Sequence, residues 1–405
     1  MESIDIQKFP YLSSPSTAKL FKTLKRNGIE ARFVGGCVRE AMLGNSAHDI
    51  DIAVNTTPEI VTNVLEKAGI KVIPTGIDHG TLTVVIDSQV FEVTSLRSDI
   101  KTDGRHAAVS FGASWFEDAQ RRDFTINAMY LSINGTMYDP CDGQSDLERG
   151  NVKFIGQAAK RIQEDYLRIL RFFRFHSRFG SKKFDQEAIT AIRANLGGLN
   201  HISRERIRME LMKILVTENS KLALDMMQKT GVADVILSGG IELGDYSSIT
   251  KLEAELGITP SHLRRLYIIL PKSLELRNLA KQLRLTKKEQ NWFTKVSTAI
   301  DDSAYTRPAH YQLYYFDTAL AIDINMIAKA NSWVNELNNI IAAAPSWSRP
   351  KLPITGNDLR SLASGKQIGA LLKSVESWWV ERRFQPNYDE CLSRAKVIAN
   401  YKNSL

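Results

Sequence analysis

The sequence predicts an α+β fold in which a small mixed sheet with helices comes first and an all-α region follows. Three observations support this prediction. Strand and helix patterns alternate between residues 30 and about 155. The strand pattern almost disappears after that point. The chain has 405 residues, 43% of them hydrophobic, which is enough for two or three packed domains.

Runs rich in β-branched and aromatic residues mark the strands of the first region. Strands are expected at 31–34, 49–54, 80–87, 89–96, 130–133 and 136–138, and helices at 38–43 and 58–69. Asn134-Gly135 is a strong two-residue hairpin turn between the last two strands. Gly44 ends the first helix, and Thr57 can cap the second.

The rest of the chain shows helical periodicity. Helices are expected at 157–178, 185–194, 203–217 and 219–229, and most of 250–405 also has a helical pattern. A Gly/Ser-rich stretch at 239–248 is a candidate boundary. We therefore expect a head at 1–155, a helical neck at 156–235, and a helical body and tail at 236–405.

Charge and cysteine usage narrow the function classes. The net charge is +8, and residues 160–213 hold 13 Lys/Arg against 6 Asp/Glu. This concentration suits a polyanionic partner, although a solvated helix face gives the same pattern. The three cysteines form no CxxC pair, which argues against a zinc ribbon or disulfide scaffold and favours the reducing cytoplasm. We expect no signal peptide and no membrane span, because no apolar run approaches the ~20 residues that a span needs.

The first candidate site is a glycine turn between a strand and a helix. Gly35 and Gly36 let the backbone approach a ligand closely, and the helix that follows offers free N–H groups to phosphate oxygens. Arg39 lies in the first turn of that helix and can add a charged contact. The alternative is an ordinary turn.

The second candidate site is acidic. Strand side chains alternate between faces, so Asp49 and Asp51 point one way while Ile50 and Ile52 point the other. Two adjacent carboxylates favour a cation between them, and Mg²⁺ prefers such hard oxygen ligands. Glu92, a lone acid in an apolar strand, is a candidate third ligand. The alternative for each is a solvent-facing strand edge.

Two basic segments complete the candidate set. In Arg121-Arg122-Asp123, the arginines can donate to triphosphate oxygens, and Asp123 or Asn127 can bond a ribose hydroxyl. In the second segment, Asp165 and Arg168 are three apart on an expected helix and share a face. Arg171, Arg174 and Arg178 continue that stripe. The alternative for the first segment is an ordinary capped helix start. The alternative for the second is a weak surface ion pair between Asp165 and Arg168.

The combination of these motifs resembles one family. FVGGCVREAMLG, DIDIAV, RRDFTINAMY, EDYLRILRFFRF and ISRERIRMELMKIL are similar to motifs of class II CCA-adding tRNA nucleotidyltransferases and bacterial poly(A) polymerases. This family belongs to the DNA polymerase β superfamily, and the resemblance covers roughly residues 30–235. Two positions depart from the family pattern, since Glu40 follows Arg39 in place of Asp and Tyr166 follows Asp165 in place of Pro.

The resemblance implies a polymerase-β-like head, and it implies a role for each matching site residue. Asp49 and Asp51 correspond to carboxylates that bind two Mg²⁺ ions. Gly36 and Arg39 correspond to triphosphate contacts, and Arg122, Arg171 and Arg174 to further nucleotide contacts. Asp165 and Arg168 correspond to the pair that selects the base. The implied partners are CTP, ATP and tRNA. With two metals activating the RNA 3′-hydroxyl and steadying pyrophosphate, no protein base is required.

Hydrogen-bond chemistry is consistent with that base selection. A carboxylate such as Asp165 only accepts, and a guanidinium such as Arg168 only donates. Cytosine and adenine each offer an amino donor beside a ring-nitrogen acceptor, whereas uracil and guanine invert both positions. One Asp–Arg pair therefore accepts C and A and rejects U and G without a nucleic-acid template.

Three alternatives remain open. A poly(A) polymerase shares almost every motif, although this chain lacks a long basic C-terminal extension. Enzymes that add only CC or only A are partial versions, and by resemblance the CC-adding ones lack a flexible loop. Residues 97–112 are expected to form that loop, with Asp103, Gly104 and Arg105 at its tip. The alternative for this segment is an ordinary surface hairpin that turns at Asp103-Gly104. An inactive RNA-binding protein is the alternative from another class, against which the intact acids argue.

Overall fold

The structure is a computed structural model that describes residues 4–403 except 48, 78–79, 104–105, 335–336 and 338, with only the backbone described at 98–109 and 401–403. The chain forms two compact units, Met1–Ile241 and Glu242–Leu405. The division falls in the Gly/Ser-rich stretch. Each unit is described by itself.

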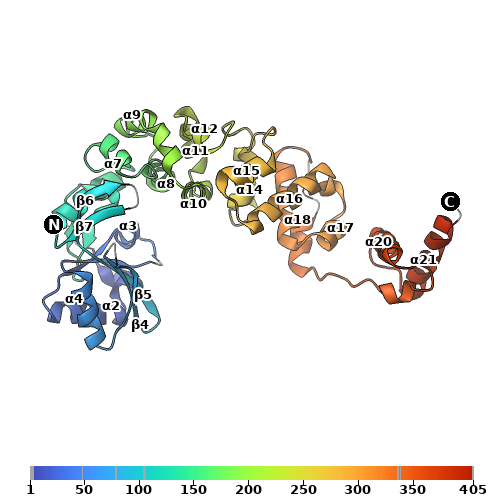
Figure 1. Cartoon of the computed structure of the whole chain (residues 1–405), viewed down its shortest axis with the longest axis horizontal. Coiled ribbons are helices and arrows are strands. Elements are labelled where there is room, and N and C mark those ends of the chain that lie inside the picture. Colours follow the sequence, from blue (N-terminus) through green and yellow to red (C-terminus); the bar gives the residue numbers. More distant parts are fainter. Residues whose placement is uncertain are drawn as a thin grey trace. The chain divides into compact units, whose positions relative to one another are not determined.

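A mixed seven-stranded sheet, in the order β3-β4-β5-β2-β1-β8-β9, organises the start of the first unit (Figure 1). Its strands are β1 (Ala31–Val34), β2 (Asp51–Val54), β3 (Lys71–Gly76), β4 (Thr81–Ile86), β5 (Gln89–Ser95), β8 (Tyr130–Leu131) and β9 (Met137–Tyr138). Strands β2 and β5 are parallel, and the other pairs are antiparallel. The predicted α+β head with a small mixed sheet is therefore confirmed.

Among the helices of this sheet region with six residues or more, only the two near 38–43 and 58–69 were predicted, and both lie close to the expected positions. The helices of the region are α2 (Pro15–Arg26), α3 (Gly36–Met42), α4 (Pro58–Lys67), α5 (Trp115–Gln120) and α6 (Gly143–Glu148). Helices α2 and α4 contact each other and the sheet (Figure 1). Buried Ile52, Phe33 and Val93 belong to the core of the sheet. A separate two-stranded hairpin, β6 (Arg97–Asp103) and β7 (His106–Phe111), lies where a flexible loop was expected and a surface hairpin was the alternative.

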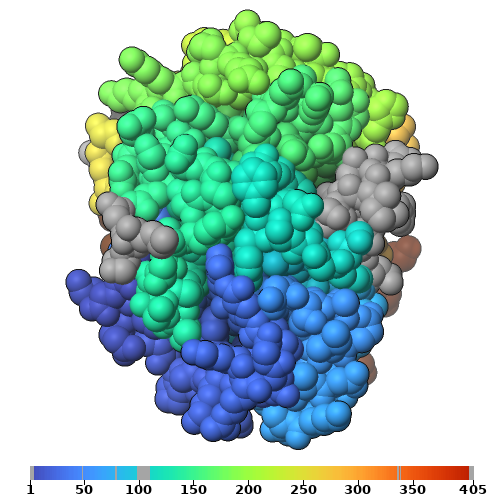
Figure 2. Space-filling view, turned by 90° about the vertical axis from the view of Figure 1, so that its left-hand side faces the viewer, coloured from blue at the N-terminus to red at the C-terminus, as the bar shows by residue number. Residues whose placement is uncertain are grey.

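Six helices follow in the same unit, where Figure 2 shows the green helices adjoining the blue and teal sheet region. They are α7 (Ala158–Glu164), α8 (Arg168–Phe179), α9 (Gln186–Ala194), α10 (Arg204–Leu215), α11 (Ser220–Lys229) and α12 (Val232–Ile236). Helix α8 packs against α10 and α11, and its Phe172 and Phe173 are fully buried.

The prediction of one continuous helix at 157–178 is wrong. The helix breaks between α7 and α8, where Asp165 has an extended backbone with φ −153° and ψ 105°. The Asp165 carboxylate accepts a hydrogen bond from the backbone N–H of Leu167 at 3.0 Å. A side chain that bonds the backbone two residues ahead competes with helical hydrogen bonding, so the break has a local cause.

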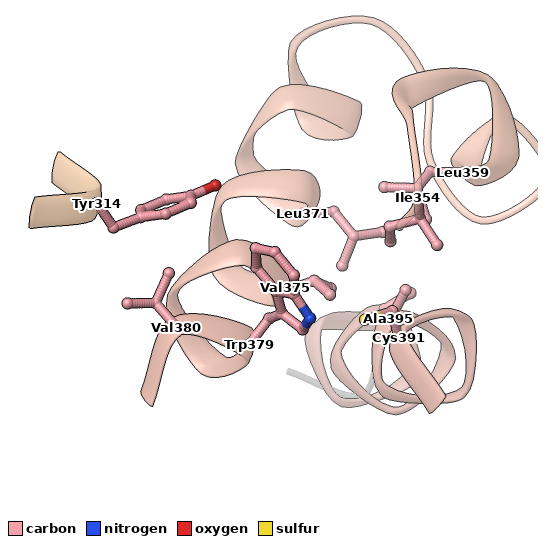
Figure 3. Close-up of a cluster of buried hydrophobic side chains, with 10 residues drawn as sticks. Tyr314, Ile354, Leu359, Leu371, Val375, Trp379, Val380, Cys391 and Ala395 are labelled. Carbon is pink, nitrogen blue, oxygen red and sulfur yellow. The ribbon is translucent and has the colours of Figure 1, made fainter. Parts of the chain in front are cut away.

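The second unit is helical throughout its described residues. Its longer helices are α13 (Tyr246–Glu255), α14 (His262–Ile269), α15 (Leu276–Leu283), α16 (Lys287–Asp301), α17 (Ala309–Tyr315), α18 (Thr318–Ala330), α20 (Lys366–Glu381) and α21 (Tyr388–Asn403). Trp379 and Val375 of α20 pack with Cys391 of α21 in a buried cluster (Figure 3). Across the ranges that the structure describes, none of the helices combines the length and the apolarity needed to cross a membrane.

Candidate active site

The turn at Gly35 begins the site because only glycine suits its backbone. Gly35 has φ +71° and ψ −121°, a conformation that other residues adopt only with strain. A Cβ atom at Gly35 would lie 3.8 Å from Asp51 Oδ2 and 3.9 Å from Arg122 Nη1. The predicted strand–Gly-Gly–helix arrangement is present, and it brings the turn next to an acid and an arginine.

Asp51 is the first residue of β2 and is half-buried. Ile50 and Ile52 are buried, as the alternation predicts. Glu92 is the register partner of Asp51 on the parallel strand β5. Burial raises the pKa of Asp51 to about 6, the charges of Glu92 and Asp49 act in the same direction, and Arg122 and Arg39 oppose them. A cation beside Asp51 would relieve this repulsion.

The three acids do not form a ready-made metal cluster. Considering only the residues that the structure describes, no group of three or more His, Cys, Asp or Glu side chains is close enough to hold a metal ion. Asp49 and Glu92 are exposed, while Asp51 is half-buried. The set of Asp49, Asp51 and Glu92 as metal ligands therefore remains a prediction.

Asp118, a residue that the sequence reasoning missed, holds the arginine pair. Its carboxylate bridges Arg121 at 2.6 Å and Arg122 at 3.0 Å, and it accepts a 2.7 Å hydrogen bond from the Tyr130 hydroxyl. Burial alone would raise the pKa of Asp118, but Arg122 and Arg121 outweigh burial and lower it to about 2. The i,i+3 and i,i+4 spacing from Asp118 on α5 to Arg121 and Arg122 just beyond it is the signal that could have found it.

Asp123 and Asn127 are also bonded to protein groups. Arg171 Nε donates to Asp123 Oδ2 at 2.6 Å, and Asn127 Nδ2 donates to Asp123 Oδ1 at 2.9 Å. Arg39 donates to the side-chain oxygen of Asn127. Burial would raise the pKa of Asp123, but Arg171 and the Asn127 hydrogen bond prevail and lower it to about 2. The ribose contact expected of Asp123 or Asn127 remains a prediction.

Arg39 of α3 and two arginines of α8 lie close to one aromatic ring of α8. The guanidinium groups of Arg39, Arg171 and Arg174 lie 5.2, 5.3 and 4.6 Å from the ring centre of Phe175. Arg174 also pairs with the buried Glu210 at 3.0 Å. The ring face attracts cations, so it lets three like charges stay close together.

The two residues predicted to select the base have different ion-pair partners. Arg168 pairs with Glu164 on α7, one turn earlier. Asp165 pairs with Arg206 on α10, whose Nη2 lies 2.7 Å from Asp165 Oδ2. The expected alternative, a surface ion pair between Asp165 and Arg168, is thus not the arrangement in this structure.

These groups line one cavity of about 430 Å³ in the first unit. Its walls are Gly35, Gly36, Arg39, Asp51, Arg121, Arg122, Asp123, Asn127, Asp165, Leu167, Arg168, Arg171, Phe175 and Arg206. The cavity unites most of the predicted site with Arg206 and Phe175, which the sequence did not single out. Asp49, Glu92 and Arg174 are outside this lining. Gly104 and Arg105 of the predicted loop lie outside the described residues, and Asp103 is described only by its backbone.

Comparison with known proteins gives concordant results. Residues 31–153 match the family described as the poly A polymerase head domain, and residues 183–240 match a probable RNA- and SrmB-binding site of polymerase A. CCA tRNA nucleotidyltransferase 1, mitochondrial, of Danio rerio is 34% identical over 400 residues, which covers 96% of this chain and 92% of that protein. The CCA-adding enzyme of Oceanobacillus iheyensis is 32% identical over 396 residues, covering 93% and 95%.

A solved structure agrees over nearly the whole chain. The CCA-adding enzyme of Bacillus stearothermophilus in complex with CTP superposes with a TM-score of 0.77 at 26% sequence identity. The match covers 96% of this chain and 98% of that one.

Proposed function

We propose a function from one premise: the chain belongs to the family of CCA-adding tRNA nucleotidyltransferases. It transfers nucleotides from CTP and ATP to the 3′ end of tRNA without a template, completing the CCA sequence and releasing pyrophosphate. The observation that carries this proposal is the cavity that joins the half-buried carboxylate of Asp51, several arginines, and the side chains of Asp165 and Arg168.

Arg39, Arg122 and Arg171 are the proposed triphosphate ligands, beside the Gly35-Gly36 turn. All three line the cavity, and each is already bonded to protein: Arg39 to Asn127, Arg122 to Asp118, and Arg171 to Asp123. A guanidinium has five N–H donors, so these partners hold the side chain and leave donors for phosphate oxygens. Donors held in place before substrate arrives stabilise charge effectively.

The family implies dependence on divalent metal, and we propose two Mg²⁺ ions held by Asp51 together with Asp49 and Glu92. The oxygen donors suit Mg²⁺. Burial, and then the charges of Glu92 and Asp49, raise the pKa of Asp51, and a cation would offset those charges. When bound, the metal supplies activation of the RNA 3′-hydroxyl and charge stabilisation for the pyrophosphate. A Cβ atom added at Gly35 or Gly36 would lie 3.8 or 4.0 Å from Asp51 Oδ2, so ions and triphosphate can share one edge of the sheet.

Asp165 and Arg168 are the proposed readers of the base. Both line the cavity. The two oxygens of Asp165 accept from Leu167 and Arg206, and a carboxylate with about four lone-pair sites can still accept from an amino group. Arg168 can donate to cytosine N3 or adenine N1. Uracil or guanine would instead place a carbonyl against the carboxylate.

We propose that the second unit binds tRNA and that the protein works in the cytoplasm. Support for the first point is the relatives' coverage of this unit. The cytoplasmic location is supported by the three free cysteines, two of which are buried. Three relatives are mitochondrial by name, so fractionation should compare both compartments.

The test uses tRNA that lacks its 3′ CCA, incubated with CTP alone, ATP alone, or both, followed by sequencing of the ends. We expect CC with CTP alone and CCA with both. Long A tails with ATP alone would indicate a poly(A) polymerase. Arrest at CC, or addition of A only to ends that already carry CC, would indicate a partial enzyme. No extension would favour an RNA-binding protein.

A further inference from the structure

The turn between α7 and α8 carries Asp165 and leads directly into Arg168, the first residue of α8, so whatever fixes this turn affects nucleotide choice. Asp165 stands outside both helices, with an extended backbone. Helical hydrogen bonds therefore do not set the direction of its carboxylate. Where the family usually has Pro, this chain has Tyr166, so a preset backbone is absent as well.

Neighbours from a later segment fix the turn instead. The ring of Tyr166 lies against Gly198, where an added Cβ would meet ring atoms at 1.9 to 2.3 Å. On the other side, Arg206 donates from Nη2 to Asp165 Oδ2 at 2.7 Å. Gly198 belongs to a 3-10 helix (Leu196–His201), and Arg206 to the first turn of α10.

We propose that Arg206 is a positioning residue for nucleotide selection. It holds the Asp165 carboxylate in the orientation that accepts an amino group and rejects a carbonyl. Both side chains line the cavity, and each is only about one-fifth exposed. The backbone N–H of Leu167 fixes one oxygen of the carboxylate and Arg206 fixes the other, so rotation of the carboxylate would break both bonds. The inference rests on the proposed function, because it assumes that Asp165 reads the base.

Loss of Arg206 would act through Asp165. The freed carboxylate could turn toward Arg168, a cation three residues away, or toward solvent. Either movement weakens the discrimination between an amino group and a carbonyl. A residue that bound triphosphate would change the KM of all four nucleotides alike, and a residue that bound tRNA would change the KM of tRNA. The ratio of kcat/KM among the four nucleotides therefore distinguishes a positioning role from triphosphate binding and from tRNA binding.

The experiment compares Arg206→Gln, Arg206→Lys and a matched control, Arg204→Gln. Arg204 lies on the same helix, outside the cavity lining, and its Nη1 is 3.5 Å from the Val235 carbonyl oxygen. For each protein, kcat/KM is measured with CTP, ATP, UTP and GTP on tRNA ends that await C or A. The KM of tRNA and the thermal melting curve are measured in parallel.

We expect Arg206→Gln to lower the preference for CTP over UTP by about tenfold, the size of one lost hydrogen bond to a charged group. Arg206→Lys keeps the charge and should fall between Gln and the wild type. Arg204→Gln should keep the wild-type ratio. If Arg206→Gln does not fold, an intermediate ratio in Arg206→Lys supports the proposal and a wild-type ratio in it overturns the proposal.

A folded Arg206→Gln variant with an unchanged four-nucleotide ratio would overturn the proposal, whatever happens to the KM of tRNA. That failure is separate from failure of the proposed function. In the first case the wild type still completes CCA, and in the second the wild type itself adds no C or A.

Discussion

Most arginines of the cavity have an acidic partner. Asp118 holds Arg121 and Arg122, Asp123 holds Arg171, and Glu164 holds Arg168. An arginine side chain carries about 2 kcal/mol of rotamer entropy, which a free side chain would lose on binding substrate. The acids reduce that loss in advance. They also lower the net positive charge of the cavity. A triphosphate would therefore be bound mainly through hydrogen bonds from oriented guanidinium groups and less through unspecific attraction to positive charge.

The first prediction concerns Asp51. Asp51→Asn should abolish nucleotide addition, because the remaining exposed acids cannot replace a half-buried ligand beside the phosphate turn. The fold should persist, since burial and the neighbouring acids already disfavour the charged form of Asp51. RNA binding should also persist, because Lys/Arg contacts to phosphates dominate it. A primer-extension assay checks this, with Glu66→Gln on the exposed face of α4 as control.

Near wild-type addition by folded Asp51→Asn would remove Asp51 from the proposed metal site. Loss of activity in Glu66→Gln as well would show that the assay responds to any lost carboxylate.

The second prediction concerns Asp118 and pH. Asp118→Asn should destabilise the protein by roughly 3 kcal/mol near neutral pH, because Arg122 loses its buried counter-charge. The folded pKa of Asp118 is about 2 against 3.8 in the unfolded chain, so its stabilisation is complete above about pH 4. The difference between wild type and variant should shrink as pH falls from about 4 toward 2. Denaturant melts across that range measure it, and a pH-independent difference would contradict the account.

Individual residues were predictable where a local pattern carried them. The alternation of Asp49 and Asp51 with Ile50 and Ile52 follows from strand geometry alone, and the buried isoleucines confirm it. Arg206 was not predictable, because it meets Asp165 from 41 positions away along the chain. No short-range pattern encodes such a contact.

At the level of elements, the sequence identified most strands and helices, and the failures have physical causes. The helix expected across 157–178 breaks because the Asp165 side chain bonds the backbone. Strand β3 was not predicted. It contains Pro74, has mostly exposed residues, and lies at the edge of the sheet, the position that tolerates proline. Residues 97–112 were expected as a flexible loop, with a surface hairpin as the alternative, and the pairing of β6 with β7 agrees with that alternative.

The third prediction tests how the broken helix is supported. Gly198→Ala would bring a methyl group within 1.9 Å of the Tyr166 ring, so the ring and the Asp165 turn must shift. We expect a loss of about 1–3 kcal/mol of stability from overpacking and weaker discrimination between CTP and UTP. Gly197→Ala is the matched control, because a Cβ there meets nothing within 4 Å. Thermal melting and four-nucleotide kinetics on both variants check it, and equal behaviour of the two would contradict this contact.

At the level of the whole molecule, the fold class was predicted from one change in the sequence pattern. Strand and helix patterns alternate in the first part of the chain, and helical patterns alone follow. The chemistry came from the order of several motifs, each ambiguous when taken singly. The structure adds that motifs as distant as Gly35 and Arg206 line one cavity. The predicted functions of head, neck, body and tail remain a proposal, and the second unit carries none of the residues that line this cavity.

The most direct test of the central claim, that protein side chains choose C and A, is the four-nucleotide selectivity of Arg168→Ala. The variant loses the donor to cytosine N3 or adenine N1, and a charged hydrogen bond contributes about 1.5–3 kcal/mol. We predict that kcat/KM for CTP and ATP relative to UTP and GTP falls roughly tenfold to a hundredfold. Arg193→Ala, an exposed charge on α9, should leave the ratio unchanged. An unchanged ratio in folded Arg168→Ala would mean that base selection lies elsewhere in the cavity.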